Sequence, residues 1–484
     1  MLRELKNELN YTFTENAAKA HRTTENYLLD FFAQGGALRN RDEDEIVELF
    51  ARAFATNEIK ALKLLFYFRD VRGGQGERRM FRVILSHLIK TDPDVAFKIM
   101  KLIPEYGRWD DLYVYADTSL EKHMFSLMAE QLFQDVKAYQ NDQPISLLAK
   151  WMKSERTHGK VNYLGLKTRK ALTLTSKEYR KLLSALRKYI DIVERKMSAK
   201  EWDEIDFEKV PSQAMFKYSR AFARQSNGYE LYLNQVESGE KTIAAKTLYP
   251  HQIVGQILDG YNYDKAHDLQ WNALPNFLEG ESADALVMAD VSGSMFHGYN
   301  NMVPLHVSIG LAIYIAERMQ GAYHNHFLTF SGQPDLVEIV GRNIYEKVNM
   351  VRKSDWGLNT DLEAAMLSIL KTAINNNISP KELPKRLIVI SDMEFDRGST
   401  SDYLSKEIEL TYLRYGYKLP KIVWWNVDAR NTQFPMTKTD NCLMVSGASP
   451  EIISAVLRDD FITPIKLMEN VINRERYNLI DQVL

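Results

Sequence analysis

The sequence predicts two joined folds: an all-α helical array in residues 1–280 and, in residues 281–484, an α/β domain with a doubly wound, Rossmann-like, mostly parallel sheet. The first half consists of short amphipathic segments separated by Gly, Pro and Asp, with almost no alternating strand patterns. From residue 285 onward, apolar runs of strand length alternate with helical patterns, as in βα units. We therefore place the boundary between residues 270 and 284.

Apolar residues recur at helical spacing throughout the first half. Thr23, Thr24 and Glu25 are expected to cap a short helix that runs through Leu38. Further helices are expected at residues 42–55, 57–69, 80–89, 93–103, 109–115, 120–139, 145–152, 161–173, 176–198 and 211–225. No strict sequence period links them, so a HEAT-like array is predicted from architecture alone. Such an array can close on the second domain, so we expect no flexible linker.

The second half alternates strands and helices. Strands are expected at residues 285–290, 326–330, 336–340, 387–392, 421–427 and 441–445, with 336–340 at an edge of the sheet. Helices are expected at residues 303–320, 344–353, 361–375, 402–415, 450–457 and 464–473. This alternation predicts parallel strands covered by helices on both faces.

Oxygen-bearing side chains follow two of these strands. Asp290 ends the first strand and is followed by Ser292 and Ser294, while Asp392 ends the strand at 387–392. Thr360 lies just before a helix between them. Ligands of open α/β sheets bind at the carboxyl ends of the strands, and carboxylates and hydroxyls suit Mg²⁺ or another hard divalent cation. The alternative, that both aspartates only cap helices or turns, does not explain why both follow buried strands.

Composition limits the class of protein. The chain has 484 residues, of which 45% are hydrophobic and 26% charged, which is typical of a soluble globular protein. A single cysteine, Cys442, excludes an internal disulfide and fits a reducing compartment. The charged first ten residues lack the apolar core of a secretory signal, and no apolar run is long enough to span a membrane. We therefore expect a cytoplasmic protein.

One block of the first half is strongly basic. Residues 151–200 carry 14 Lys and Arg against 4 Asp and Glu, although the whole chain has a net charge of −2. Tyrosines are interleaved with the cations, and aromatic rings beside cations can stack on bases. We expect RNA contacts from Lys167, Arg169, Lys170, Lys177, Arg180 and Lys181. The alternative is a solvated helical face with its tyrosines in the core.

A turn rich in glycine and arginine occupies residues 70–79, DVRGGQGERR. Its glycines allow exposed backbone N–H groups, and Arg72, Arg78 and Arg79 beside them could cradle a phosphate. The segment lacks the GK[ST] ending of a P-loop. The alternative is a helix end followed by an exposed turn.

The order Asp-x-Ser-x-Ser, Thr, Asp after a buried strand resembles the von Willebrand factor type A domain and its metal-ion-dependent adhesion site. The resemblance implies that Asp290, Ser292, Ser294, Thr360 and Asp392 hold the metal directly or through water. It also implies an open metal position that an Asp or Glu of a partner protein fills.

The first half carries a second resemblance. The stretches DVRGGQGERR and IPEYGRWDDLY (103–113) resemble the module shared by telomerase-associated, Ro and vault proteins. Together with a C-terminal type A domain, this layout is similar to that of Ro-like proteins, which implies a HEAT-repeat ring whose basic hole and outer surface bind RNA. The chain also resembles an uncharacterised family found in phages, bacteria and eukaryotes, whose members share openings like TENAAKAHRTTENYLLDFF and the segment SKEYRKLLSALR. That resemblance spans nearly the whole chain.

The sequence contains no HExxH, GxSxG, CxxC or Walker A motif. We therefore predict a non-enzymatic RNA-binding protein whose type A domain uses Mg²⁺ to dock a partner protein. One alternative is a protein–protein adaptor that binds no nucleic acid. Another is a metal-dependent nuclease, since Glu394 and Asp396 add carboxylates beside Asp392.

Overall fold

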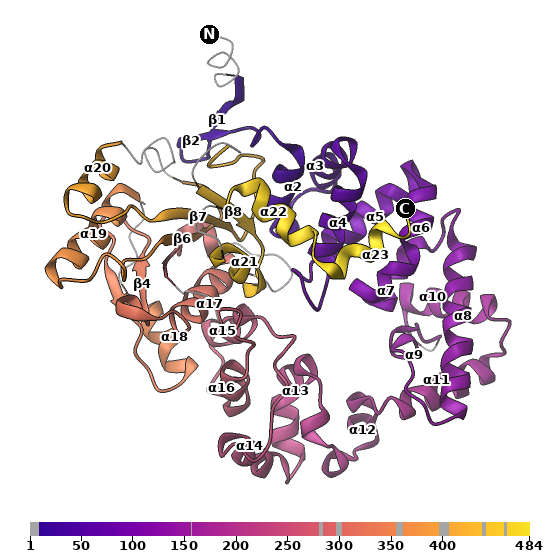
Figure 1. The fold of residues 1–484 in the computed structure, drawn as a ribbon. Coiled ribbons are helices and arrows are strands. Elements are labelled where there is room, and N and C mark those ends of the chain that lie inside the picture. The colour runs from indigo at the N-terminus through magenta and orange to yellow at the C-terminus, as the bar shows by residue number, and fades with distance from the viewer. Residues whose placement is uncertain are drawn as a thin grey trace.

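The computed structural model describes residues 9–155, 157–279, 284–296, 303–354, 362–395, 406–437, 442–458 and 462–484. Helices dominate the part before residue 280, and a six-stranded mixed sheet organises the part after it. The helical array curves round so that both of its ends pack against the sheet domain (Figure 1). Among the described helices, none combines the length and apolarity that crossing a membrane requires.

The N-terminal segment differs from the prediction. It forms an antiparallel hairpin of β1 (Tyr11–Phe13) and β2 (Lys19–His21), and His21 exchanges backbone hydrogen bonds with Phe434 of the sheet domain. Sequence patterns missed the hairpin because its strands are three residues long. The cap of the next helix, α2 (Tyr27–Gly35), is Asn26, whereas the hydroxyls of Thr23 and Thr24 donate to Asp30 in its first turn.

Most helices expected in the array are present with shifted ends, but residues 109–115 form a 3-10 helix, the helix expected at 176–198 divides in two, and a helix at 229–237 was not predicted. The α-helices of the array follow α2 in order. Their bounds are α3 (Glu43–Thr56), α4 (Glu58–Arg69), α5 (Arg79–Thr91), α6 (Pro93–Ile99), α7 (Ile103–Tyr106), α8 (Glu121–Gln140), α9 (Leu148–Trp151), α10 (Gly159–Ala171), α11 (Ser176–Tyr189), α12 (Val193–Ala199), α13 (Ser212–Gln225), α14 (Tyr229–Glu237), α15 (Pro250–Leu258) and α16 (Lys265–Asn272). The expected helix at 93–103 instead divides into α6, a 3-10 turn and α7. Pro104 lies in the first turn of α7, where a missing N–H costs nothing.

The sheet has the strand order β5-β4-β3-β6-β7-β8. The edge strand β5 is antiparallel to β4, and all the other neighbours are parallel. The strands are β3 (Ala285–Ala289), β4 (His326–Thr329), β5 (Leu336–Glu338), β6 (Arg386–Ser391), β7 (Lys421–Asn426) and β8 (Cys442–Ser446). This confirms a C-terminal α/β fold whose sheet consists mostly of parallel strands.

Two apolar clusters cover the two faces of this sheet. Along β3, Leu286 and Met288 join one cluster, while Val287 and Ala289 join the other. Helices α19 (Leu362–Asn375) and α20 (Lys406–Arg414) cover the first face. Helices on the second face are α17 (Pro304–Ala316), α18 (Ile344–Arg352), α21 (Ile453–Leu457) and α22 (Pro464–Ile472). The strands other than the edge strand β5 are therefore buried on both sides, which explains their apolar runs.

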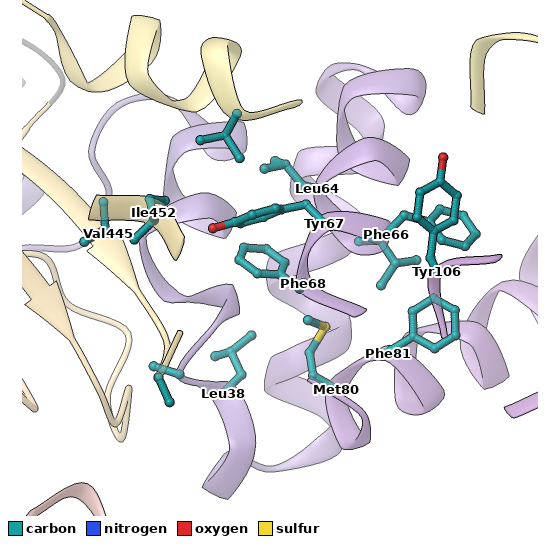
Figure 2. Packing of buried hydrophobic residues seen from close by; sticks show 14 of the residues in the cluster. Leu38, Leu64, Phe66, Tyr67, Phe68, Met80, Phe81, Tyr106, Val445 and Ile452 are labelled. Atoms are coloured by element: carbon teal, nitrogen blue, oxygen red, sulfur yellow. The ribbon is translucent and has the colours of Figure 1, made fainter. Parts of the chain in front are cut away.

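The cluster on the second face continues into the helical array. Figure 2 shows Tyr67 and Phe68 of α4 beside Val445 of β8 and Ile452, which ends the 3-10 turn before α21. Helix α2 packs on β8, and α4 packs on α22. The start of the array and the end of the sheet domain thus share one core.

A buried ion pair fixes this closure. Asp70 is fully buried at the end of α4, and its carboxylate accepts hydrogen bonds from Arg476 and from the Tyr477 hydroxyl. The Tyr106 hydroxyl donates to the Arg476 carbonyl at 2.6 Å, and the Tyr106 ring stacks on Tyr477. We call these four residues the clasp. Ion pairs beside it are Lys63–Asp481 and Lys60–Glu469.

We expect Arg476→Ala to lower the free energy of unfolding by about 2–3 kcal/mol, because it leaves the Asp70 carboxylate buried without its cation. The value lies at the low end for a broken buried pair because Arg476 is 30% exposed. Urea unfolding measures the change. The matched control is Arg52→Ala, which removes an exposed i,i+4 pair worth less than about 1 kcal/mol. Equal losses in both variants would contradict a clasp.

Candidate functional site

The register of β3 and β6 places the two predicted aspartates side by side. Ala289 pairs with Ile390, and the Asp290 N–H donates to the Ile390 carbonyl at 2.9 Å. Asp290 and Asp392 therefore emerge at the same carboxyl edge, each 2% exposed. The Asp290 carboxylate accepts a hydrogen bond from the Ser391 hydroxyl at 2.7 Å.

The predicted serines lie in the turn that follows Asp290. The Ser292 N–H donates to Asp290 Oδ1 at 2.8 Å, and the hydroxyls of Ser292 and Ser294 are 3.0 Å apart. Thr360, the remaining predicted ligand, lies outside the described residues. We call Asp290, Ser292, Ser294 and Asp392 the metal edge.

The charges of the metal edge are not balanced internally. Burial and, after it, the negative charge of Asp392 raise the pKa of Asp290 to about 7, against hydrogen bonds from Ser391 and Ser292. Among the described residues, the cation that pairs with Asp392 is Arg430, whose Nη2 donates to its Oδ2 at 2.9 Å. A cation bound between the two carboxylates would relieve their repulsion.

A third acid, which was not predicted from the sequence, lies at this edge. Asp428 follows β7, is 2% exposed, and accepts a hydrogen bond from the Asn40 side chain at 2.9 Å. Burial and the charge of Asp392 raise the pKa of Asp428 to about 6, against the hydrogen bond from Asn40. The sequence pattern that indicated Asp290 and Asp392 is also present here, since KIVWWNVD (421–428) is another buried strand followed by an acid.

The metal edge fits a hard cation by its donor chemistry. Carboxylate and hydroxyl oxygens are the ligands that Mg²⁺ prefers, and Mg²⁺ commonly keeps several waters. Across the described residues, no group of three or more His, Cys, Asp or Glu is arranged to hold a metal. A cation here would therefore depend on serine hydroxyls and water as well as on the two aspartates.

The N-terminal hairpin covers the neighbourhood of this edge. The Thr14 hydroxyl donates to the Phe395 carbonyl at 2.7 Å, and the Asn16 amide donates to the Glu394 carbonyl at 3.0 Å. The Glu15 N–H donates to the Glu394 carboxylate, also at 3.0 Å. Glu394 is thus occupied in seating the hairpin rather than in facing solvent.

The predicted RNA-contacting residues of the basic block divide into two groups. Lys167 pairs with Asp117 and Glu121, while Arg169 and Arg180 pair with Glu155. The other three are exposed side chains on α10 and α11: Lys170, Lys177 and Lys181. About half of the predicted footprint is therefore neutralised within the chain.

The Gly/Arg turn is a packed joint. A side chain at Gly74 would meet the Tyr67 carbonyl at 2.0 Å, and Gly76 has a φ of +69° beside the Tyr249 hydroxyl. Each of its three predicted phosphate ligands has a partner within the chain. Arg72 donates to the Glu105 carbonyl, Arg78 donates to the carboxylates of Asp110 and Asp111, and Arg79 donates to the Arg41 carbonyl. Close packing explains these glycines without a ligand.

A cavity of about 1410 Å³ lies between the turns of the array from Val71 to Tyr249. We call it the central cavity. Its described lining contains two glutamates, Glu155 and Glu194, and seven cations: Arg72, Arg108, Lys150, Arg180, Arg187, Arg195 and Lys217. Five aromatic residues also line it: Trp109, Trp151, Tyr179, Tyr218 and Tyr249. Two of the residues that were predicted to contact RNA, Arg72 and Arg180, line it, and Arg108 and Trp109 belong to the segment 103–113. No single local motif joins the lining, because it comes from helices and turns that are far apart in the chain.

Two of the lining cations have fixed orientations. The Arg108 guanidinium lies 3.8 Å from the centre of the Trp151 ring and donates to Asp110. The Arg187 guanidinium donates to the carbonyls of Ala149 and Met152, both at 2.8 Å. Burial lowers the pKa of Arg187, so an anion beside it would replace lost solvation.

The comparisons with known proteins match the chain in two parts. Residues 14–112 and 155–282 match a domain of unknown function, DUF2828, and residues 284–478 match another, DUF7788. The chain is also similar to an uncharacterised protein of Acanthamoeba polyphaga mimivirus. The identity is 29% over 510 aligned residues, which cover 96% of this chain and 87% of the relative. None of these descriptions states an activity.

We expect Mg²⁺ to raise the thermal midpoint of the protein, and Asp290→Asn to abolish that rise. A ligand at one hundred times its Kd stabilises a folded protein by about 2.7 kcal/mol. Differential scanning fluorimetry with and without Mg²⁺ measures the effect. The control is Asp284→Asn, which lies at the opposite end of β3 and pairs with Lys385. An unchanged Mg²⁺ response in Asp290→Asn would exclude the metal edge as the site.

A pH dependence follows from the raised pKa of Asp290. The unfolded chain releases this proton near pH 3.8 and the folded chain near pH 7, so the stability that the proton contributes is lost as pH rises between about 4 and 7. With a chelator present, the thermal midpoint should fall less steeply between about pH 4 and pH 7 in Asp290→Asn than in the unmodified protein. Parallel curves would show that Asp290 does not carry this penalty.

Proposed function

We propose that the protein binds single-stranded RNA in the central cavity and docks a partner protein through a cation at the metal edge. The observation that carries the RNA part is the lining, which has seven cations against two glutamates. Cations that neutralise phosphates supply most of the sequence-independent affinity for nucleic acid. Aromatic side chains beside them add base stacking.

Preorganisation supports the same proposal. Arg108 is held against Trp151, and Arg187 is held by two backbone carbonyls. Neither side chain would lose much conformational freedom when it binds a phosphate, so more of the interaction would remain as affinity. The resemblance to Ro-like proteins, in which a helical ring binds RNA, is in keeping with this arrangement.

The proposal assigns binding rather than catalysis to the two sites. None of the metal-edge residues is among the described residues that line the central cavity. The part of an RNA that lies in the cavity would therefore not contact these four residues. A Mg²⁺ held by Asp290, Ser292, Ser294 and Asp392 would instead supply an open position for a carboxylate of a partner protein.

We expect Lys150→Glu with Lys217→Glu to weaken RNA binding at least tenfold, because both side chains line the cavity and reverse from attraction to repulsion. Fluorescence polarisation with a labelled oligouridine, over a series of salt concentrations, measures affinity. The parent should weaken steeply with salt, by a slope of about 0.7 per phosphate neutralised, and the variant less steeply. The control is Lys90→Glu with Lys122→Glu, two exposed residues outside the cavity.

Three outcomes would count against this proposal. Absence of binding by the parent at low salt would remove the RNA function and favour an adaptor. Equal weakening in both double variants would place the footprint outside the cavity. Cleavage of the oligomer with Mg²⁺ or Mn²⁺ that disappears in Asp290→Asn would replace binding by a nuclease function.

A further inference from the structure

A second cavity, of about 710 Å³, lies at the start of α5. We call it the arginine cavity. Its described lining contains two acids, Glu43 and Glu77, and four arginines: Arg39, Arg78, Arg79 and Arg82. The turn residue Gly76 lines both this cavity and the central one, so the two lie on either side of the same turn. The lining carries two more positive than negative charges.

Two of its arginines are fixed from behind by a buried acidic pair. Arg78 Nη2 donates to Asp110 at 2.5 Å, and Arg82 Nε donates to Asp111 at 2.7 Å. Asp110 is 4% exposed and Asp111 is fully buried. The same two carboxylates also pair with Arg69, Arg108 and Lys153. Five cations thus share two negative charges, which leaves an excess of positive charge beside the cavity.

The other two arginines do not contact that acidic pair. Arg79 Nη1 donates to the Arg41 carbonyl at 2.7 Å, and its Nη2 lies 3.9 Å from the Glu43 carboxylate. Arg39 pairs with Glu77. The positions of Arg78 and Arg82 are therefore explained by their pairing with Asp110 and Asp111. That pairing does not explain why Arg39 and Arg79 line the same cavity.

The electrostatics favour an anion at this place. Burial lowers the pKa of Arg39 to about 10. The pKa of Arg78 is also lowered, first by burial and then by the positive charge of Arg82. These shifts mean that desolvation and repulsion between like charges both disfavour the cations. A bound anion would offset both effects.

We propose that the arginine cavity binds a phosphomonoester or diphosphate group, as found at the phosphorylated end of an RNA or on a free nucleoside diphosphate. A phosphomonoester carries a charge of about −1.5 to −2 at pH 7, which matches the lining, whereas a phosphodiester carries about −1. The planar guanidinium fork fits phosphate oxygens in pairs. The RNA source rests on the proposed function; the phosphate chemistry does not.

The test compares ligands that differ in their terminal phosphate. Binding of the full-length protein is measured by polarisation for one labelled oligouridine sequence with a 5′-phosphate, with a 3′-phosphate or with hydroxyls at both ends. Binding of ADP alone is measured by calorimetry. We expect ADP to bind, and one phosphorylated RNA to bind about tenfold more tightly than the unphosphorylated one, as charge-assisted hydrogen bonds predict.

Arg79→Gln is the informative variant, because Arg79 lines the cavity without contacting Asp110 or Asp111. It should lose the tenfold preference and most of the ADP binding, while binding unphosphorylated RNA as the parent does. Lys90→Gln is the matched control: it removes the same charge at the other end of α5, about 16 Å away at 1.5 Å per residue. It should change neither measurement.

The outcomes separate this inference from the proposed function. RNA binding without any preference for a terminal phosphate, and without ADP binding, would overturn the arginine cavity and leave the central cavity standing. ADP binding that Arg79→Gln abolishes, in a protein that binds no RNA, would support the arginine cavity and overturn the RNA function. Equal losses in Arg79→Gln and Lys90→Gln would also overturn the arginine cavity.

Discussion

The buried carboxylate of Asp70 links helix α4, near the start of the helical array, to the C-terminal residues Arg476 and Tyr477. Arg476 and Tyr477 bind it from the C-terminal segment, and it ends the helix whose aromatic face packs on the sheet domain. The Gly/Arg turn begins at this residue, and its Gly76 lines both basic cavities. The closure that holds this turn would lose about 2–3 kcal/mol if the Asp70 carboxylate were left buried without Arg476.

A different constraint shapes the metal edge. Parallel pairing of β3 with β6 places Asp290 and Asp392 next to each other whether or not their charges are compensated. Burial and mutual repulsion then raise the pKa of Asp290. The two carboxylates therefore repel each other at this edge of the sheet, and a bound cation would relieve the repulsion. The N-terminal hairpin contacts Glu394, and Arg430 contacts Asp392. The metal edge thus has an excess of negative charge, whereas the central cavity has an excess of positive charge, and the two proposed sites lie on different elements.

The sequence predicted what short stretches encode. An apolar run followed by an acid located Asp290 and Asp392, because a strand and the residue after it are neighbours in the chain. Local patterns named only Arg72 and Arg180 among the cations of the central cavity, because its lining comes from helices and turns spread between Val71 and Tyr249. The predicted basic footprint was incomplete for a related reason, since Lys167 is neutralised by Asp117, a residue that lies 50 positions away. Pairing over such distances depends on the tertiary fold, which local patterns do not contain.

Photo-crosslinking tests the central claim, that RNA lies inside the ring of helices, most directly. An oligomer carrying 4-thiouridine would be bound at low salt, irradiated, and the modified peptides identified by mass spectrometry. We predict crosslinks in peptides that contain Trp151, Tyr218 or Tyr249, three of the five aromatic residues that line the central cavity. Crosslinks confined to peptides of α8 or α14, which contribute no residue to the described lining, would contradict it.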